Sequence, residues 1–210
     1  MLKVITCILA GLGAGVGTGF AGMSAAAVIS PMLITFLHMD PYMAVGIALA
    51  SDVLASAASA VTYARNRNLD IKNGVIMMVS VLAFTLVGSG VASLVPQTTM
   101  GNFSFFMTLL LGIKFIVKPD MAPKQRFAQA TGRQKAIRSI IGGSVVGFIC
   151  GFIGAGGGMM MLLVLTSILG YELKTAVGTS VFIMSATALT GSVSHFVIGG
   201  MPDVEALILC

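Results

Sequence analysis

The sequence predicts an all-α, polytopic transmembrane protein, and its composition, charge and hydropathy all support that prediction. Of the 210 residues, 57% are hydrophobic and only 9% are charged, whereas about 25% charged residues are usual in a soluble domain. The mean hydropathy is +1.01, and apolar runs long enough to cross ~30 Å of hydrocarbon recur along the chain. The lipid bilayer is therefore the expected partner. The formal charge of +5 indicates loops that face one side of the membrane, and not binding to nucleic acid.

The chain contains two copies of one unit. The motif over Gly19–Gly22 matches Gly151–Gly154 at a fixed offset (151 − 19 = 132), and Ala44–Gly46 matches Ala176–Gly178 at the same offset. A shared offset without gaps predicts a duplication. We therefore divide the chain into a first transmembrane repeat over residues 1–117, a basic linker over 118–136 and a second repeat over 137–210.

The first repeat opens with a segment that is too long for one crossing. Leu2–Met39 would extend about 55 Å as a single helix, so it is predicted to break near Gly19–Ser24 into a hairpin of two full spans or two half-spans. Ser24 is a candidate N-cap for the second arm. The helices that follow are predicted over about Tyr42–Tyr63, Gly74–Val95 and Phe103–Val117.

The second repeat is predicted to follow the same plan. Its helices are expected over Ile137–Phe152, Met159–Leu169 and Thr175–Ile198, with a glycine break between the first two and a short segment over Asp203–Cys210 at the end. Counterparts of the last two helices of the first repeat would lie at about 206–249 on the 132-residue offset. We therefore expect the sequence to be a fragment that lacks two C-terminal helices; a naturally shorter second repeat is the alternative.

The number of segments and the positions of the basic residues predict the topology. Five segments per repeat is an odd number, so the second repeat would enter from the opposite face and form an inverted repeat. Under that count every lysine and arginine except Lys3 falls on one side, which places the basic loops in the cytoplasm and the N-terminus outside. Counting each long hairpin as a single span keeps most basic residues together as well, so charge alone does not establish the inversion.

The glycine-rich breaks are the predicted substrate site. Gly156, Gly157 and Gly158 disfavour a helix interior, and a half-helix that begins inside the membrane points unpaired N–H groups and partial positive charge at whatever precedes it. Two such ends that meet near the midplane would bind an anion. The alternative is close helix packing through small residues. The predicted substrate-binding residues are Gly22, Ser24, Ser51, Gly154, Gly156, Gly157, Gly158, Thr179 and Ser180.

Asp52 and His195 are the candidates for coupling transport to an ion gradient. A carboxylate inside a membrane helix is costly and usually faces a cavity or a partner, and a histidine titrates near neutral pH. Hydrogen bonding to a neighbouring helix is the structural alternative for both. Met184 stands at the position of Asp52 in the second repeat, so the two halves would not share this role. No catalytic residue, metal site or cofactor is predicted.

Two other functions remain open at this stage. Ser192 and His195 are three residues apart on one predicted helix face and could form an intramembrane hydrolase pair. A passive anion channel would have the same sequence features as a carrier.

At the glycine breaks the sequence resembles the sulfite exporter TauE/SafE family of membrane permeases. The matching features in the second repeat are the glycine cluster Gly154–Gly158 and the Ala-Val-Gly-Thr-Ser motif over Ala176–Ser180. The first repeat departs from the pattern, with Gly22–Ala26 lacking the glycine triplet and Ala44–Ala48 lacking Thr-Ser. The resemblance implies a secondary-type transporter in a prokaryotic plasma membrane, which moves sulfite, sulfonates or related organic anions along an ion gradient.

Overall fold

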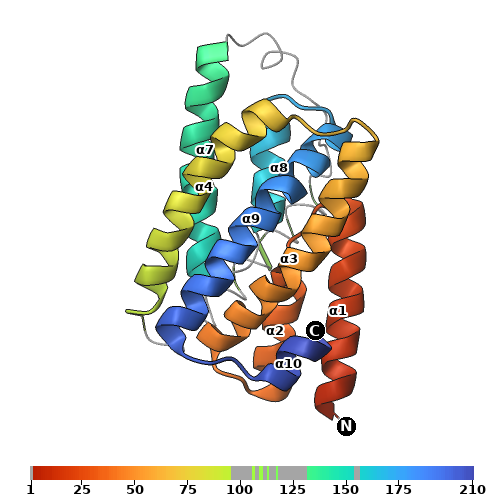
Figure 1. Ribbon diagram of the computed structural model, residues 1–210, viewed down its shortest axis with the longest axis vertical. Coiled ribbons are helices and arrows are strands. Elements are labelled where there is room, and N and C mark those ends of the chain that lie inside the picture. Colours follow the sequence, from red (N-terminus) through yellow and green to blue (C-terminus); the bar gives the residue numbers. More distant parts are fainter. Residues whose placement is uncertain are drawn as a thin grey trace.

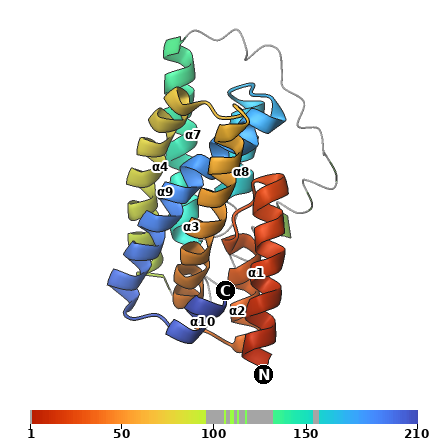
Figure 2. The same ribbon diagram turned by 45° about the vertical axis from the view of Figure 1, so that its right-hand side comes forward.

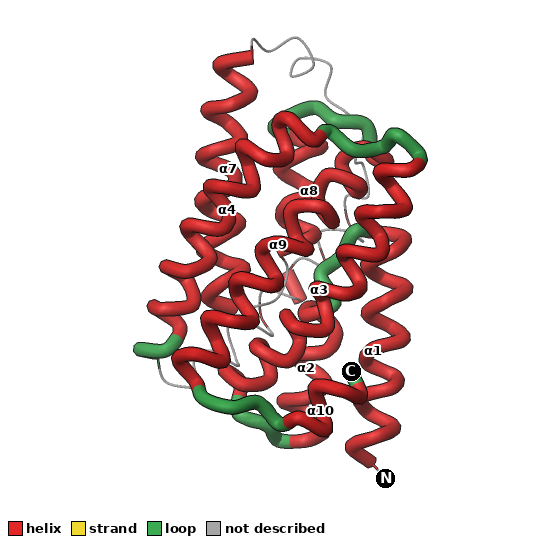
Figure 3. The backbone as a smooth tube through the Cα atoms, in the orientation of Figure 1, coloured by secondary structure: helices red, strands yellow, loops and turns green. Residues whose placement is uncertain are grey.

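The computed structural model describes residues 2–95, 132–153 and 157–210, with isolated positions between 106 and 117. The predicted helix over Phe103–Val117 and most of the predicted linker fall outside this part of the chain, as do Gly154 and Gly156. Within the described part the elements are helices joined by short loops (Figure 3).

The first repeat begins with the predicted hairpin. α1 (Leu2–Ala21) and α2 (Ala26–Leu37) are separated by a break at residues 22–25. Gly22 has a φ of +61°, a conformation that glycine adopts without the steric cost of a side chain. The hairpin therefore has a long arm of 20 residues and a short arm of 12.

The next two helices each start at an aspartate cap. α3 (Pro41–Arg65) has proline at its first turn, and the Asp40 carboxylate accepts from the Met43 N–H at 3.0 Å. α4 (Ile71–Ala92) is capped by Asp70, which accepts from the Asn73 N–H at 3.1 Å. A carboxylate at these positions satisfies free N–H groups and complements the helix dipole.

The second repeat presents its helices in the same order. α7 (Gly132–Ile153), α8 (Gly157–Ser167), α9 (Leu173–Gly199) and α10 (Val204–Leu209) correspond to α1, α2, α3 and the start of α4. α7 begins within the predicted linker, several residues before the expected start. The helix includes the polar residues from Gly132 onward, because a helix end outside the apolar core does not need apolar side chains.

α3 and α9 form the centre of the molecule and run in opposite directions (Figure 1). The pairing is closest at glycines. A Cβ on Gly46 would lie 2.8 Å from the Phe196 ring, and a Cβ on Gly199 would lie 2.8 Å from the Tyr42 ring. Thus the start of α3 contacts the end of α9, and two equivalent helices of the repeats are antiparallel.

α4 packs along α7 through a row of glycines on α7. A Cβ on Gly143 would lie 2.9 Å from the Met77 carbonyl oxygen, and Cβ atoms on Gly147 and Gly151 would overlap the carbonyls of Val81 and Thr85. Such close backbone approach is the usual geometry of small-residue packing in membranes. The two helices run in parallel.

α10 packs on α1, and these two helices run in parallel, as α4 and α7 do (Figure 2). Lys3 forms ion pairs with Asp203 at 2.8 Å and Glu205 at 2.7 Å, and a Cβ on Gly11 would lie 2.8 Å from the Cys210 carbonyl oxygen. Gly11 stands 132 residues before Gly143. The contact of α10 with α1 therefore stands at the same 132-residue offset as the contact of α4 with α7.

Within the described residues, five helices are long and apolar enough to cross a membrane: α1, α3, α4, α7 and α9. α2 and α8 are apolar but shorter, at 12 and 11 residues. The polytopic helical fold predicted from the sequence is confirmed for this part of the chain.

Replacing Gly147 tests the α4–α7 contact. We expect Gly147→Ala to destabilise the protein by about 1–3 kcal/mol, because the new methyl group overlaps backbone atoms of Val81 that belong to a helix and cannot rotate away. Thermal unfolding of the detergent-purified protein measures the effect.

Gly15→Ala is the matched control, since Gly15 is the equivalent position on α1 and a Cβ added there would have no neighbouring atom within 4 Å. This variant should be neutral or more stable by about 0.5–1 kcal/mol through helix propensity. Equal midpoints for the two variants would contradict the close packing of α7 on α4.

Candidate functional site

The first break meets the start of α8 inside the molecule. A Cβ on Gly158, in the first turn of α8, would lie 2.5 Å from the Gly22 carbonyl oxygen and 2.7 Å from the Ser24 nitrogen. The contact is thus made by backbone, and no side chain fits at Gly158 between α8 and the first break. Gly157 lies beside it and packs on Cys150, whereas Gly154 and Gly156 are outside the described residues.

Asp52 supplies the cap of α2 from the neighbouring helix α3. Its carboxylate accepts from the Ser24 hydroxyl at 2.6 Å and from the Ala25 N–H at 3.0 Å, and the Ser56 hydroxyl donates to its backbone carbonyl. Asp52 is 1% exposed. A negative charge at this helix start balances the partial positive charge of the free N–H groups.

The prediction that Ser24 caps α2 is wrong. The Ser24 hydroxyl accepts no hydrogen bond from the α2 start and donates to Asp52 instead. A carboxylate is a stronger acceptor than a hydroxyl, so the hydroxyl becomes the donor when both face the same helix end.

α9 closes the other side of the bends with Ser180 and Met184. The Ser180 hydroxyl lies 2.9 Å from the Cβ position of Gly22 and donates to the Val177 carbonyl oxygen at 2.9 Å. The Met184 sulfur lies 2.6 Å from the Cβ position of Gly158. Met184 therefore contacts the start of α8 much as its counterpart Asp52 contacts the start of α2, but it brings no charge.

Two predicted site residues lie elsewhere. The Thr179 hydroxyl accepts from the Asp70 N–H at 3.1 Å, in the loop between α3 and α4. The Ser51 hydroxyl donates to the Ile47 carbonyl oxygen at 3.1 Å, and Ser51 lines a cavity beside α10. Each is adjacent in sequence to a residue at the bends, but a step of one residue turns a helix by about 100°.

His195 belongs to a separate buried cluster. Its Nδ1 lies 2.9 Å from the Ser89 hydroxyl and 2.9 Å from the Gly191 carbonyl oxygen, and its ring stacks on Tyr42 with centroids 4.3 Å apart. The Nε2 atom is buried and has no hydrogen-bond partner. The hydroxyl that pairs with this histidine is that of Ser89, from another helix, and not that of Ser192.

Asp70 and Tyr171 hold the loops together at the end of the molecule where α9 begins. The Tyr171 hydroxyl donates to the Asp70 carboxylate at 2.6 Å. Burial raises the pKa of Asp70, but the hydrogen bonds from Tyr171 and Asn73 outweigh it and leave the pKa below its usual value. Burial and the adjacent carboxylate both raise the pKa of Tyr171.

The described residues contain no group of three or more His, Cys, Asp or Glu side chains that could hold a metal ion. The buried polar groups instead form small clusters on helix ends and helix contacts.

Comparison with known proteins identifies the family. The family model described as "Sulfite exporter TauE/SafE" matches residues 7–210. The chain belongs to the sulfite exporter TauE/SafE family. No solved structure matches it.

Two curated relatives of this TauE/SafE chain come from Bacillus subtilis (strain 168). One is named "Probable membrane transporter protein YunE" and is 26% identical over 228 aligned positions, which cover 99% of this chain and 84% of the relative. The other is named "Probable membrane transporter protein YdhB" and is 21% identical, covering 88% of this chain and 76% of the relative. The predicted family resemblance is confirmed, and the chain is a membrane transporter protein by this membership.

Sequence reasoning missed the partners of both titratable residues in this TauE/SafE protein. Ser24 and Asp52 are 28 positions apart, and Ser89 and His195 are 106 apart. The only sequence signal for these pairs was the presence of a polar residue within each apolar helix. Which of these polar residues face each other is decided by the packing of the helices.

Tyr171→Phe tests the loop contact. We expect a loss of about 1 kcal/mol of stability at pH 7, the usual net value of one hydrogen bond. Because the folded-state pKa of Asp70 is lowered, its contribution is complete above the unfolded pKa of about 4 and is lost as pH falls through the folded value. The difference between wild type and variant should therefore shrink as the pH falls below about 4, as followed by thermal unfolding.

Tyr63→Phe is the control. The Tyr63 hydroxyl donates to the Gly19 carbonyl oxygen at 3.2 Å, which does not titrate, so its loss should cost the same at each pH. A pH-independent effect of Tyr171→Phe would contradict the assigned Asp70 contact.

Proposed function

We propose that this TauE/SafE chain carries a small anion of the sulfite or sulfonate class across the membrane by alternating access, with the substrate site where the two bends meet. The observation that carries the proposal is the Asp52 carboxylate at the start of α2, beside the contact of Gly22 and Ser24 with Gly158. An internal anion already occupies one of the two helix starts, and helix starts favour anions.

The arrangement of the helices supports an inverted repeat. The equivalent helices α3 and α9 are antiparallel, and the pairs α1–α10 and α7–α4 are reciprocal and both parallel. A two-fold axis in the membrane plane relates elements in this way, and transporters with inverted repeats place their substrate sites at such an axis.

The difference between Asp52 and Met184 suggests a division of roles. α2 receives a carboxylate from α3, whereas α8 receives only the thioether of Met184 from α9. We therefore assign the substrate anion to the start of α8, near Gly157, Gly158 and Ser180. Asp52 would take up a proton when the substrate approaches, because two unscreened negative charges at one buried place repel strongly.

The contact between the bends corresponds to a closed conformation. Backbone atoms of Gly22 and Ser24 touch Gly158, so an anion enters only when α2 and α8 separate. Movement of one hairpin against the other would open the site to each side in turn.

Asp52→Asn tests the coupling role. In proteoliposomes with a proton gradient, the variant should accumulate sulfite or methanesulfonate about tenfold less than wild type, since the amide keeps the shape of the side chain but binds no proton. Exchange of internal for external substrate should persist. Asp203→Asn is the matched control, because Asp203 pairs with Lys3 at the surface and should keep full accumulation.

The possible outcomes separate the alternatives. Unchanged accumulation in Asp52→Asn would exclude the coupling role. Flux that does not saturate and shows no exchange would indicate a passive channel. Failure of the wild type to move either anion would overturn the substrate class.

A further inference from the structure

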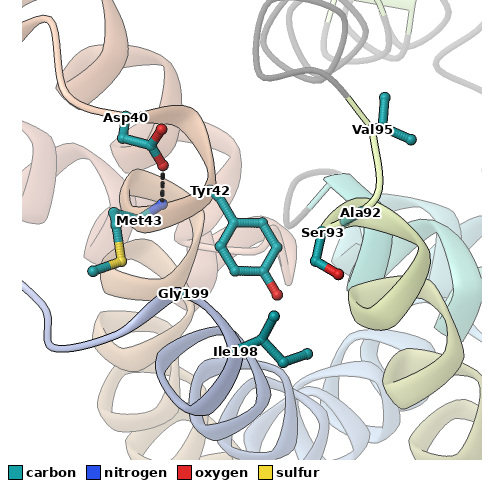
Figure 4. A pocket seen from close by; sticks show the side chains of 8 residues that line it. All are labelled: Asp40, Tyr42, Met43, Ala92, Ser93, Val95, Ile198 and Gly199. Carbon is teal, nitrogen blue, oxygen red and sulfur yellow. Dashed lines mark hydrogen bonds between the residues drawn. The ribbon is translucent and has the colours of Figure 1, made fainter.

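Two open cavities lie at opposite ends of the α3–α9 pair. One has a volume of about 550 Å³ and is lined by Gly19, Thr62, Tyr63, Asn66, Asn68 and Lys174; we call it the Lys174 cavity. The other has a volume of about 420 Å³, and its lining includes Asp40, Tyr42, Met43, Ser93 and Ile198 (Figure 4); we call it the Tyr42 cavity.

The two cavities occupy equivalent places in the two repeats. Tyr42 and Lys174 are related by the 132-residue offset, as are Asn66 and Ile198. Tyr42 lies at the start of α3 and Lys174 at the start of α9. The duplication has therefore produced one cavity at each end, and their chemistry can be compared position by position.

The charged side chains that line the two cavities are of opposite sign, because Glu172, the counterpart of Asp40, is exposed at the start of α9 and does not line the Lys174 cavity. The Lys174 cavity holds an exposed ammonium group, amides of Asn66 and Asn68 and the hydroxyl of Thr62. Among the described residues, the side chain of Lys174 has no ion pair or hydrogen bond. The Tyr42 cavity is lined by the carboxylate of Asp40. At the positions equivalent to Lys174 and Asn66 it has the phenol ring of Tyr42 and the side chain of Ile198 (Figure 4).

The Lys174 cavity ends next to the first bend. Gly19 lines it and stands three residues before Gly22, and the Tyr63 hydroxyl closes onto the Gly19 carbonyl oxygen at 3.2 Å. Tyr63 also contacts Gly178 on α9. The Tyr63–Gly19 hydrogen bond therefore joins a wall of the cavity to the end of α1 that leads into the first break.

We propose that the Lys174 cavity is a capture site for the small anion, with Lys174 as the attracting charge and the Tyr63–Gly19 hydrogen bond as the barrier to the bends. The inference rests on the proposed transport of an anion. It adds a specific entrance and a sidedness: the anion is held at the end with Lys174 and not at the end with Asp40. A cation at the mouth of a cleft raises the local concentration of an anion and its rate of entry.

Lys174→Gln tests the proposal in proteoliposomes made from the whole protein. The variant should raise the KM for sulfite and methanesulfonate entering from the Lys174 side about three- to tenfold, with less than about a twofold change in kcat, because the lost interaction is charge-assisted but partly solvated. The KM from the opposite side should stay unchanged. Lys72→Gln is the matched control, since Lys72 is an exposed lysine at the same end of the molecule and does not line the cavity.

Chemical restoration of the charge gives a second readout. Lys174→Cys treated with 2-aminoethyl methanethiosulfonate regains a side chain with a terminal ammonium and should regain the low KM, whereas the 2-sulfonatoethyl reagent should raise it further. Wild type treated with each reagent controls for Cys7, Cys150 and Cys210. Equal KM values for Lys174→Gln and wild type, or an equal rise of KM in Lys72→Gln, would overturn the capture site. Neither outcome would contradict the proposed function, which the accumulation measured with Asp52→Asn tests separately. Absence of anion flux in the wild type would instead overturn the proposed function.

Discussion

The hydrogen bonds from Ser24 and Ala25 to the Asp52 carboxylate are the interaction on which the arrangement of the bends depends. A helix that begins inside a membrane has N–H groups that neither water nor lipid can satisfy, and each unsatisfied group costs several kcal/mol. Asp52 satisfies one of them directly and balances the dipole of α2. It also fixes α2 to α3, which in turn packs along α9. The position of Gly22 against Gly158 follows from these links.

Small residues provide the close contacts that surround this centre. Glycines of α7 admit the backbone of α4, Gly11 admits the end of α10, and Gly46 admits the ring of Phe196. Packing of this kind replaces the hydrophobic effect as the cause of association, because lipid chains are as apolar as the side chains they touch. Most of the glycines that suggested breaks in the sequence therefore serve helix packing. In the described part of the chain, Gly22 stands at the first break, and Gly157 and Gly158 stand at the start of α8.

The sequence was sufficient for the family, the first hairpin break and the helices in the described part of the chain, because each depends on local composition or on a short motif. The site was predictable only in part. Gly22, Ser24, Asp52, Gly158 and Ser180 are brought together, since the bends and the two long helices determine their neighbourhood. Thr179 and Ser51 are adjacent to site residues in sequence but lie on other helix faces.

The pairing of His195 with Ser89 and Tyr42 could not be predicted from the sequence. It depends on the rotation of α9 against α4 and α3, which no periodicity in these uniformly apolar helices specifies.

Under the proposed alternating access, the backbone contact between Gly22 and Gly158 would limit how fast the protein can work. A gate made by a side chain opens when one rotamer changes, within nanoseconds, but two touching backbones separate only when whole segments shift, on the microsecond-to-millisecond scale.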